Sequence, residues 1–411
     1  MADVYIIGIG MTRFGRYLDS RLEAIARPAV EEALSDAGIG RGDVQAAFFA
    51  NTAQGVVEGQ HLVRGQLVLR ALGFEHIPVM NIENACASAS TALNAAFAFI
   101  ASGQGDIALA LGAEKMNAAD RAKSFAIFDG AWDVHDVDAS VSRLAALGKD
   151  LPLPAGAGQN SGKRSVFMDV YAALARYHMH RFGTTQRDIA EVSAKNHRHS
   201  ALNTKAQYQD AMTADDVLAA REVSWPLTLP MCAPISDGAA AAIVCSAAKA
   251  RELGATRAIR IAASVIGSGS DREADDLDHH LCRLAANRAY ESAGVGPADM
   301  SVAEVHDASA FAELHQAELL GFSDIGDGAR LVRNGDTALG GRIPINTSGG
   351  LESRGHPIGA TGLAQVYELV MQLRGEAGPR QVDGARHAIA ENGGGFHRYE
   401  EATACITILE R

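Results

Sequence analysis

Apolar residues along this chain alternate between two spacings from one end to the other. Runs that are apolar almost throughout, such as DIALALGAE (residues 106–114) and ARHAIAENG (385–393), predict buried β-strands. Between such runs, apolar residues recur every three to four positions, which is typical of amphipathic helices. Strands and helices that alternate in this way predict an α/β fold, in which helices cover a parallel or mixed sheet.

The second half of the chain repeats the pattern of the first. Residues 31–49 (EEALSDAGIGRGDVQAAFF) and 287–305 (NRAYESAGVGPADMSVAEV) are identical at six of nineteen positions without gaps. In both segments a helix ends at Gly, a turn follows with Asp at a helix-start position, and a strand begins. We therefore predict an internal duplication of one layered α/β unit, because the period is too long for a solenoid.

The region between the two copies interrupts the repeat. It contains a Gly/Pro/Ser-rich loop (150–165) and two predicted helices, FMDVYAALARYHMHRFG and TQRDIAEVSAKNHRHSAL. A long insertion with its own helices is more often functional than decorative. We predict a first half formed by 1–120 plus 201–257, an inserted domain at 118–200 and a second half at 258–411.

Composition and charge narrow the classes of partner. The 411 residues are 47% hydrophobic and carry a net charge of −12, which argues against nucleic acid and anionic membranes as main partners. No stretch approaches the roughly 20 apolar residues of a membrane span. The N-terminal segment lacks a secretory pattern, and the C-terminal ILER is not the peroxisomal Ser-Lys-Leu address. The five cysteines are scattered and without metal-ligand spacing, so we expect free thiols, no metal and a cytoplasmic location.

Cys86 is a candidate nucleophile. The residues before it predict a strand and those after it a helix, so the cysteine falls on the turn at a helix N-terminus. Free backbone N–H groups and the helix dipole favour a thiolate there. Small neighbours such as Ala85 and Ala87 leave the sulfur approachable. The alternative is a buried structural cysteine.

His356 is a candidate general base. It lies in a glycine-rich segment, NTSGGLESRGHPIGATG (346–362), directly before a predicted helix. In the second half this segment occupies the place that Cys86 has in the first, so pseudo-symmetric halves would bring the two side chains together. A histidine there can polarise a thiol. The alternative is a glycine-rich turn in which the histidine is incidental.

Two further segments follow predicted strands. His306-Asp307-Ala308-Ser309 comes at the carboxyl end of a strand, where ligands usually bind in α/β sheets. Helix capping by Asp307 or Ser309 is the alternative for those two residues. The glycine run in ENGGGFHRYEE (391–401) could supply backbone N–H groups to an anion, or form a flexible turn.

These blocks, in this order, resemble the thiolase superfamily, and the resemblance covers essentially the whole chain. The family's G-H-P-x-G-A-T-G signature is complete at Gly355–Gly362, and N-x-E-x-A-C-A-S around Cys86 is similar to its nucleophile block. The His306-Asp307 pair and the opening VYIIGIGMTRFG are similar to the sterol-carrier-protein type and the archaeal acetoacetyl-CoA thiolases. The resemblance implies a duplicated, five-layered α-β-α-β-α fold with an inserted loop domain.

The resemblance also implies roles for individual residues. Cys86 would accept the acyl group, and His356 would activate it and then help hold the thioester oxygen. His306 would support that first oxyanion hole. The backbone N–H groups of Cys86 and Gly394 would form a second hole for the acyl-enzyme carbonyl.

The chain departs from the family pattern at one catalytic position. Most thiolases carry a second cysteine in a final Cys-x-Gly motif, where it moves the proton of the α-carbon. The best alignment places Asn392 there, and a one-residue shift would place Glu391. The corresponding position of the sterol-carrier type is Ala308. Asn cannot act as a base, so His306, His356, Glu391 and the substrate itself remain candidates.

Coenzyme A is the substrate carrier that the resemblance implies, with no permanently bound cofactor. The insertion would carry it, and Ser236 would lie near its pantetheine arm. Basic candidates for the phosphates are Lys163, Arg164, Arg181 and Lys195–Ser200, and a solvated helix face is the alternative for each. The resemblance further implies a homodimer or homotetramer, and relatives of this branch often bind a small partner with a zinc ribbon and an OB-fold.

We compare four functions with these features. The favoured one is a thiolase-like C-acyltransferase that works by a ping-pong course through acyl-Cys86, either cleaving 3-ketoacyl-CoA or condensing two acyl-CoAs. A second is acyl transfer from Cys86 to a carbon acceptor other than an acyl-CoA. A third is a non-catalytic subunit, although Cys86 and His356 are both present. A decarboxylating ketoacyl synthase would need an H-G-T-G-type block, which the sequence lacks.

Overall fold

Nine strands form one continuous mixed sheet in the computed structural model, which describes residues 3–130, 132–147, 149, 153–158 and 165–411. Their order is β3-β2-β4-β7-β1-β8-β11-β10-β9. The strands are β1 (Val4–Met11), β2 (Ala46–Ala50), β3 (Val79–Ile82), β4 (Ile107–Glu114), β7 (Gly238–Ser246), β8 (Ile259–Ser268), β9 (Val302–Glu304), β10 (His387–Gly394) and β11 (Thr403–Glu410). A separate short hairpin pairs β5 (Glu222–Ser224) with β6 (Leu227–Thr228).

The sheet consists of two copies of one pattern that meet edge to edge. We call β3-β2-β4-β7-β1 the first sheet and β8-β11-β10-β9 the second sheet. In the first copy, β2 pairs in parallel with β3 and β4, while β7 pairs antiparallel with β4 and β1. In the second copy, β9 pairs in parallel with β10 and bridges Ile345, while β11 pairs antiparallel with β10 and β8. Only two residue pairs, Tyr5–Arg260 and Ile6–Ile259, join β1 to β8. The predicted duplication is therefore confirmed.

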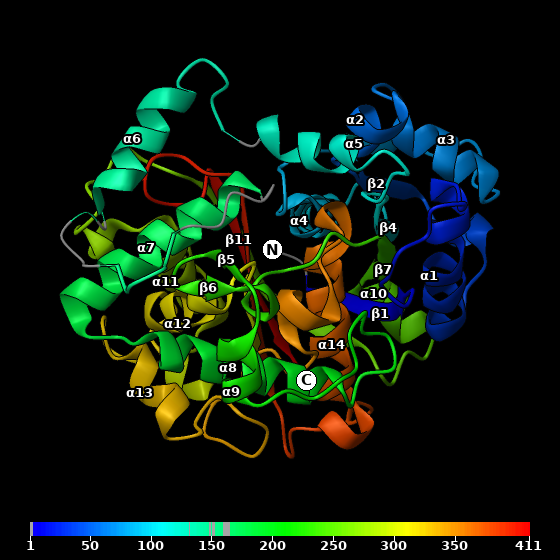
Figure 1. Ribbon diagram of the computed structural model, residues 1–411. Coiled ribbons are helices and arrows are strands. Elements are labelled where there is room, and N and C mark those ends of the chain that lie inside the picture. The colour runs from blue at the N-terminus through cyan, green and yellow to red at the C-terminus, as the bar shows by residue number, and fades with distance from the viewer. Residues whose placement is uncertain (1–2, 131, 148, 150–152, 159–164) are drawn as a thin grey trace.

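Helices cover both sheets and fill the space between them (Figure 1). α1 (Leu22–Ala37) packs on the outer side of the first sheet, and α11 (Leu281–Ala293) on the outer side of the second. α4 (Ser88–Ala101) and α14 (Thr361–Arg374) lie between the sheets and share one apolar core with strands of both copies. This order of layers is α-β-α-β-α, as predicted.

The remaining helices lie outside these layers or around their rims. They are α2 (Gln54–Glu58), α3 (Arg64–Ala71), α5 (Arg121–Ala126), α6 (Val137–Leu147), α7 (Val166–Phe182), α8 (Gln186–Ser200), α9 (Ala214–Ala219), α10 (Ala247–Glu252), α12 (Ala310–Leu319) and α13 (Gly328–Arg333). The two helices predicted in the insertion are α7 and α8. Ser165 caps α7, and a reciprocal Thr185–Asp188 capping box starts α8.

The described part of the insertion contains helices but no strand between Arg121 and Ala219. Its helices α5 to α8 run from cyan to green in Figure 1. The exact domain boundaries stay a prediction. Among the residues that the structure describes, no helix combines the length and apolar character needed to cross a bilayer.

Close packing of α1 on β1 requires glycine at position 10. A Cβ atom at Gly10 would overlap the carbonyl oxygen of Ala29 and lie 2.7 Å from the backbone nitrogen of Ala33. We therefore expect Gly10→Ala to lower the free energy of unfolding by about 1–3 kcal/mol, the usual cost of overpacking. Chemical denaturation measures this change. Gly42→Ala is the control, because nothing lies within 4 Å of its Cβ position, and equal stability of the two variants would contradict the prediction.

Candidate active site

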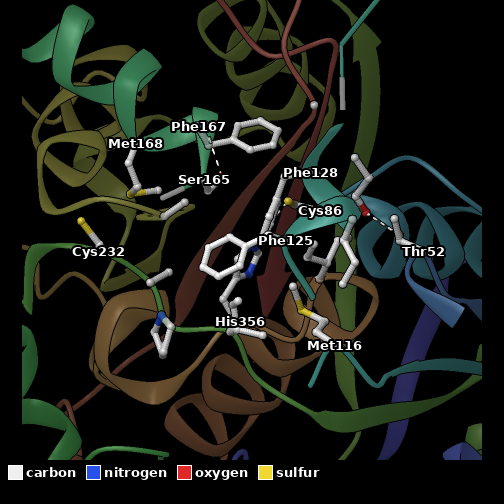
Figure 2. A pocket seen from close by; sticks show the side chains of 18 of the residues that line it. Thr52, Cys86, Met116, Phe125, Phe128, Ser165, Phe167, Met168, Cys232 and His356 are labelled. Atoms are coloured by element: carbon white, nitrogen blue, oxygen red, sulfur yellow. Dashed lines mark hydrogen bonds between the residues drawn. The ribbon is translucent and has the colours of Figure 1, made fainter. Parts of the chain in front are cut away.

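A cavity of about 470 Å³ lies where the two halves meet the insertion. Its wall takes residues from the turn before α4, from the ends of β9 and β10, from the segment before α14 and from α7. Figure 2 shows Cys86 and His356 in this cavity together with the aromatic side chains of Phe125, Phe128 and Phe167. The carboxyl ends of parallel strands from both halves therefore supply the cavity, as is usual for α/β sheets.

The turn that carries Cys86 is fixed by its own neighbours. Ala85 has a positive φ of 47°, and α4 begins two residues after the cysteine. The Ser88 hydroxyl accepts a hydrogen bond from the Asn84 N–H at 2.8 Å and donates to the Ala85 carbonyl at 2.6 Å. These contacts hold the sulfur toward the cavity, at the helix N-terminus that the sequence predicts.

Cys86 is nevertheless protonated at neutral pH. Burial raises the pKa of its thiol to about 12, and the charges of Glu114 and Glu83 raise it further. The expectation that the helix N-terminus favours a thiolate is therefore wrong for the resting enzyme, because loss of solvent outweighs the dipole. The thiol needs a base at the moment of attack.

His356 is placed to be that base. Its Nε2 lies 3.3 Å from the Cys86 Sγ, and its Nδ1 lies 2.7 Å from the Thr361 hydroxyl. The Thr361 hydroxyl donates its proton to the Pro357 carbonyl, so it must accept from the Nδ1–H of His356. The lone pair of His356 consequently resides on Nε2 and faces the thiol. Burial holds the pKa of His356 well below its usual value, so the ring is neutral and able to take a proton.

His306 has the opposite tautomer. Its Nδ1 lies 3.0 Å from the Asn392 Nδ2, while the Asn392 Oδ1 accepts a hydrogen bond from the Ser90 hydroxyl. The amide group of Asn392 therefore donates to Nδ1, which leaves the proton of His306 on Nε2. Burial lowers the pKa of His306 to about 3. His306 is thus a neutral donor at the cavity wall, 5.2 Å from the His356 ring between centroids.

Asn392 lies outside the cavity. It is fully buried, and its amide bridges α4 and the histidine. It contacts His306 from behind the cavity wall, so its observed role is to position that histidine.

The glycine run presses against the turn that carries the nucleophile. A Cβ atom at Gly394 would overlap the Asn84 carbonyl and lie 2.8 Å from the Ala87 nitrogen. The backbone N–H of Gly395, the residue after Gly394, partly offsets the rise in the pKa of the Cys86 thiol. Both glycines line the cavity.

Buried charges anchor the segment that leads to His356. Arg354 is 1% exposed and donates to Glu304 at 3.0 Å, and the Ser348 hydroxyl donates to the same carboxylate. Asp307 accepts the Leu351 N–H at 2.7 Å, so Asp307 holds this segment and does not cap α12. Ser309 occupies the cap position, but its side chain makes no capping bond.

The residues predicted for coenzyme A are spread over different environments. The Ser236 hydroxyl is fully buried outside the cavity wall and accepts the His356 N–H at 2.9 Å. The Lys195 ammonium is buried against Glu313 at 2.9 Å, so it is not free to bind a phosphate. Arg181 is half exposed near Asp275. Lys163 and Arg164 lie outside the described residues.

Sequence reasoning missed three features of the cavity wall. Two exposed arginines, Arg121 and Arg221, line the cavity. A row of aromatic rings, Phe128, Phe167, Phe396 and Tyr171, covers another side, with neighbouring centroids 5.3–5.9 Å apart. Glu401 is the third feature. No local pattern marks these residues, because they lie up to 280 positions apart.

Comparisons with known proteins agree with this geometry. Residues 4–218 match the family described as thiolase, N-terminal domain, and residues 264–411 match the thiolase C-terminal domain-like family. The chain is 36% identical to an acetyl-CoA acetyltransferase of Methanothermobacter thermautotrophicus, and the match covers 100% of both chains. It is 36% identical to human sterol carrier protein 2 over 95% of this chain and 69% of that protein.

Two further similar proteins are described with other activities. The benzoylsuccinyl-CoA thiolase subunit BbsB of Thauera aromatica is 34% identical over 92% of this chain and 91% of its own. A solved structure described as the Ltp2-ChsH2(DUF35) aldolase superposes with a TM-score of 0.77 at 25% identity and covers 99% of this chain and 97% of that chain.

The raised pKa of Cys86 predicts how its reactivity depends on pH. With a pKa of about 12 the thiolate fraction is small at neutral pH and grows about tenfold per pH unit. We expect the rate of Cys86 modification by iodoacetamide to rise about tenfold per unit between roughly pH 7 and 9. Peptide mass spectrometry measures it, with glutathione as the reagent control. A rate that levels off near neutral pH would contradict this prediction.

Proposed function

The chain belongs to the thiolase superfamily and is an acyltransferase of the thiolase type, and we propose that it transfers acyl groups between CoA thioesters through an acyl-Cys86 intermediate. The observation that carries this proposal is the 3.3 Å contact between the Cys86 thiol and the unprotonated Nε2 of His356. A neutral thiol and a neutral base at this distance are the starting state for nucleophilic attack.

In the first half-reaction His356 takes the thiol proton while the Cys86 sulfur attacks the carbonyl carbon of the acyl donor. Negative charge develops on the carbonyl oxygen, and backbone N–H groups of Cys86 and of Gly394 or Gly395 are the donors that would stabilise it. Each such donor is typically worth about 3–4 kcal/mol of transition-state stabilisation. Collapse of the adduct breaks the bond to the leaving group, which departs with its electron pair as the thiolate of CoA from an acyl-CoA or as the enolate of the shorter acyl-CoA from a 3-ketoacyl-CoA, and a thioester remains on Cys86.

In the second half-reaction a second thioester occupies the place of the first product. The Nε2–H of His306 and the Nε2–H that His356 has gained would hold its thioester oxygen, because both rings face the cavity. Thiolytic cleavage of a 3-ketoacyl-CoA and Claisen condensation of two acyl-CoAs use the same groups in opposite order. The direction depends on the supply of substrates.

The cavity wall supports a bulky acyl group. The row of four aromatic rings gives a broad apolar surface next to the nucleophile, which suits rings and branched chains as well as short acyl groups. Arg121 and Arg221 are exposed at the same cavity and are our candidates for the phosphates of coenzyme A.

Acyl transfer to a carbon acceptor other than an acyl-CoA is the second candidate function. The observation that favours it is the lack of cysteine at Asn392 and at Ala308, the two positions where relatives carry a second catalytic thiol. A small partner with a zinc ribbon and an OB-fold remains a prediction. The similar solved structure is described as an assembly with a DUF35 protein.

Acyl loading tests the proposed function. We expect the protein mixed with acetyl-CoA or larger acyl-CoAs to gain the mass of one acyl group, mapped to Cys86, and free CoA to discharge it. Cys86→Ser should abolish the thioester, and His356→Asn should slow loading by about 100-fold or more, since it removes the base. Intact-protein mass spectrometry measures both. Folded wild-type protein that loads no acyl group would refute the proposed function.

We also propose that the protein is a dimer joined through the first half. β3 is an edge strand whose outer side is unpaired within the described chain. Its Met80 is partly exposed, and the neighbouring α2–α3 segment exposes Leu62, Val63 and Leu67, with Leu62 75% exposed. An exposed edge strand beside an apolar patch favours pairing with a second copy.

A charge on this edge is expected to weaken the dimer. Met80→Lys would place an ammonium group on the paired strand, where a like charge from the second copy would face it. Light scattering coupled to size-exclusion chromatography should then show more monomer than for wild type. Leu253→Lys is the control, because Leu253 is similarly exposed but lies after α10. Identical profiles for both variants would contradict an interface at β3.

A further inference from the structure

The carbon–carbon step needs a group that acyl loading does not use. Condensation requires removal of a proton from the α-carbon of the second thioester, and cleavage requires its return. Four side chains on the described cavity wall could accept a proton without first losing one: His306, His356, Glu83 and Glu401. The tyrosine and cysteines on that wall have raised pKa values and stay protonated at neutral pH.

Neither histidine has a nitrogen lone pair that is available for the α-proton. The His356 Nε2 takes the proton of Cys86, and its Nδ1–H is donated to Thr361. The cavity-facing Nε2 of His306 carries a proton, because the Asn392 amide donates to Nδ1. A neutral imidazole presents only one lone pair, so neither ring offers a free base to the α-carbon.

Glu83 is poorly placed for this task. It is exposed to solvent, and one oxygen of its carboxylate is held by the Ala85 N–H at 2.7 Å. Glu391, the carboxylate suggested by sequence alignment, is fully buried behind the cavity wall and accepts the His306 N–H at 2.8 Å.

Glu401 lies in the segment that follows β10, and its side chain lines the cavity. Its Cγ would lie 2.5 Å from a Cβ atom at Gly393, so its side chain fills the space that a side chain at Gly393 would take. Gly393, Gly395 and Glu401 line the same cavity as Cys86. The carboxyl group therefore stands beside the glycine run that faces the nucleophile.

Neighbours hold this carboxylate in one orientation. One oxygen accepts the Gln316 amide at 2.9 Å, and the other accepts the Cys282 thiol at 3.5 Å. The side chain is 11% exposed, and that part opens to the cavity. Rigid support of a partly open carboxylate is the arrangement that proton transfer to a bound substrate requires.

We propose that Glu401 is the acid–base residue of the carbon–carbon step, in place of the second cysteine that most thiolases use. This inference rests on the proposed function. In condensation the carboxylate takes the α-proton, and the electron pair of the broken C–H bond forms the enolate. The enolate carbon attacks the carbonyl of acyl-Cys86, the C–S bond to the cysteine breaks, and a C–C bond has formed. The leaving thiolate takes up one proton and Glu401 gives one up, which restores the starting enzyme.

The electrostatic surroundings suit a base that works near neutral pH. Burial raises the pKa of Glu401, and the charge of Glu400 adds to the effect. Burial and the charge of Glu401 raise the pKa of its neighbour Glu391 to about 8. Two buried carboxyl groups that share the Cys282 thiol therefore hold a proton more readily than exposed ones. A carboxylate of raised basicity is better able to remove a carbon-bound proton.

Hydrogen exchange at the α-carbon tests Glu401 separately from Cys86. Wild type, Glu401→Gln and the control Glu291→Gln are incubated with acetyl-CoA in deuterium oxide, and the deuterium content of the acetyl methyl group is followed by mass spectrometry. Glu291 is exposed on α11 and does not line the cavity. Acyl loading of Cys86 and thermal melting are measured on the same samples. We expect Glu401→Gln to load Cys86 but to lose α-exchange and acetoacetyl-CoA cleavage by about 100-fold or more, while Glu291→Gln exchanges at nearly the wild-type rate.

The other outcomes of this experiment separate an error in the assignment of Glu401 from an error in the proposed function. Exchange by Glu401→Gln at the wild-type rate, or an equal loss of exchange in Glu291→Gln, would overturn the assignment of Glu401. Loss of loading together with exchange in a folded Glu401→Gln would also overturn it, because the residue would then serve the first half-reaction. Absence of loading in wild type refutes the proposed function itself. If Glu401→Gln does not fold, Glu401→Asp is used in its place, because it keeps the charge but withdraws it by one methylene. We expect this variant to show slowed exchange with normal loading. Unchanged exchange in Glu401→Asp would overturn the assignment.

Discussion

The contact between two helices that begin at the active site is the constraint on which the rest of this structure depends. α4 and α14 pack against each other between the two sheets, and each N-terminus carries one half of the nucleophilic pair. Small residues make this approach possible: a Cβ at Gly362 would overlap the Ser90 hydroxyl and lie 2.7 Å from the Ser90 backbone nitrogen. Because the helices are held between two sheets, the 3.3 Å distance from sulfur to imidazole is fixed by the core of the protein.

Buried polar contacts then decide the proton positions. The Thr361 hydroxyl determines that the His356 lone pair faces Cys86, and the Asn392 amide determines that the His306 proton faces the cavity. Two neutral imidazoles 5.2 Å apart thus have opposite roles, one as acceptor and one as donor. Burial supports this division, because it disfavours the charged form of both rings and of the thiol. The thiol and the two imidazoles are therefore uncharged before a substrate arrives.

The glycine run at the end of β10 lies between the nucleophile and the carboxyl group of Glu401. β10 ends in Gly393 and Gly394, which have no room for side chains, and this lets the turn that carries Cys86 pack on Gly394 while Glu401 packs on Gly393. In the proposed reaction the thiol and the carboxylate act in successive half-reactions at one cavity. Loss of the second cysteine would then be compensated by a residue from a different segment of the chain.

The sequence by itself determined the duplicated α/β fold, because the repeat of the helix–turn–strand pattern and its apolar spacing are local features. It also identified Cys86 and His356 as candidates for a reactive pair, since both stand at glycine- or alanine-rich turns before helices in equivalent places of the two halves. Only the tertiary structure decided the tautomers of the histidines, the protonated state of the thiol and the position of Asn392 behind His306, which depend on contacts across both halves. It alone placed Glu401 and the aromatic rings at the cavity. Residues up to 280 positions apart meet there, and no spacing along the chain encodes which of their atoms face one another.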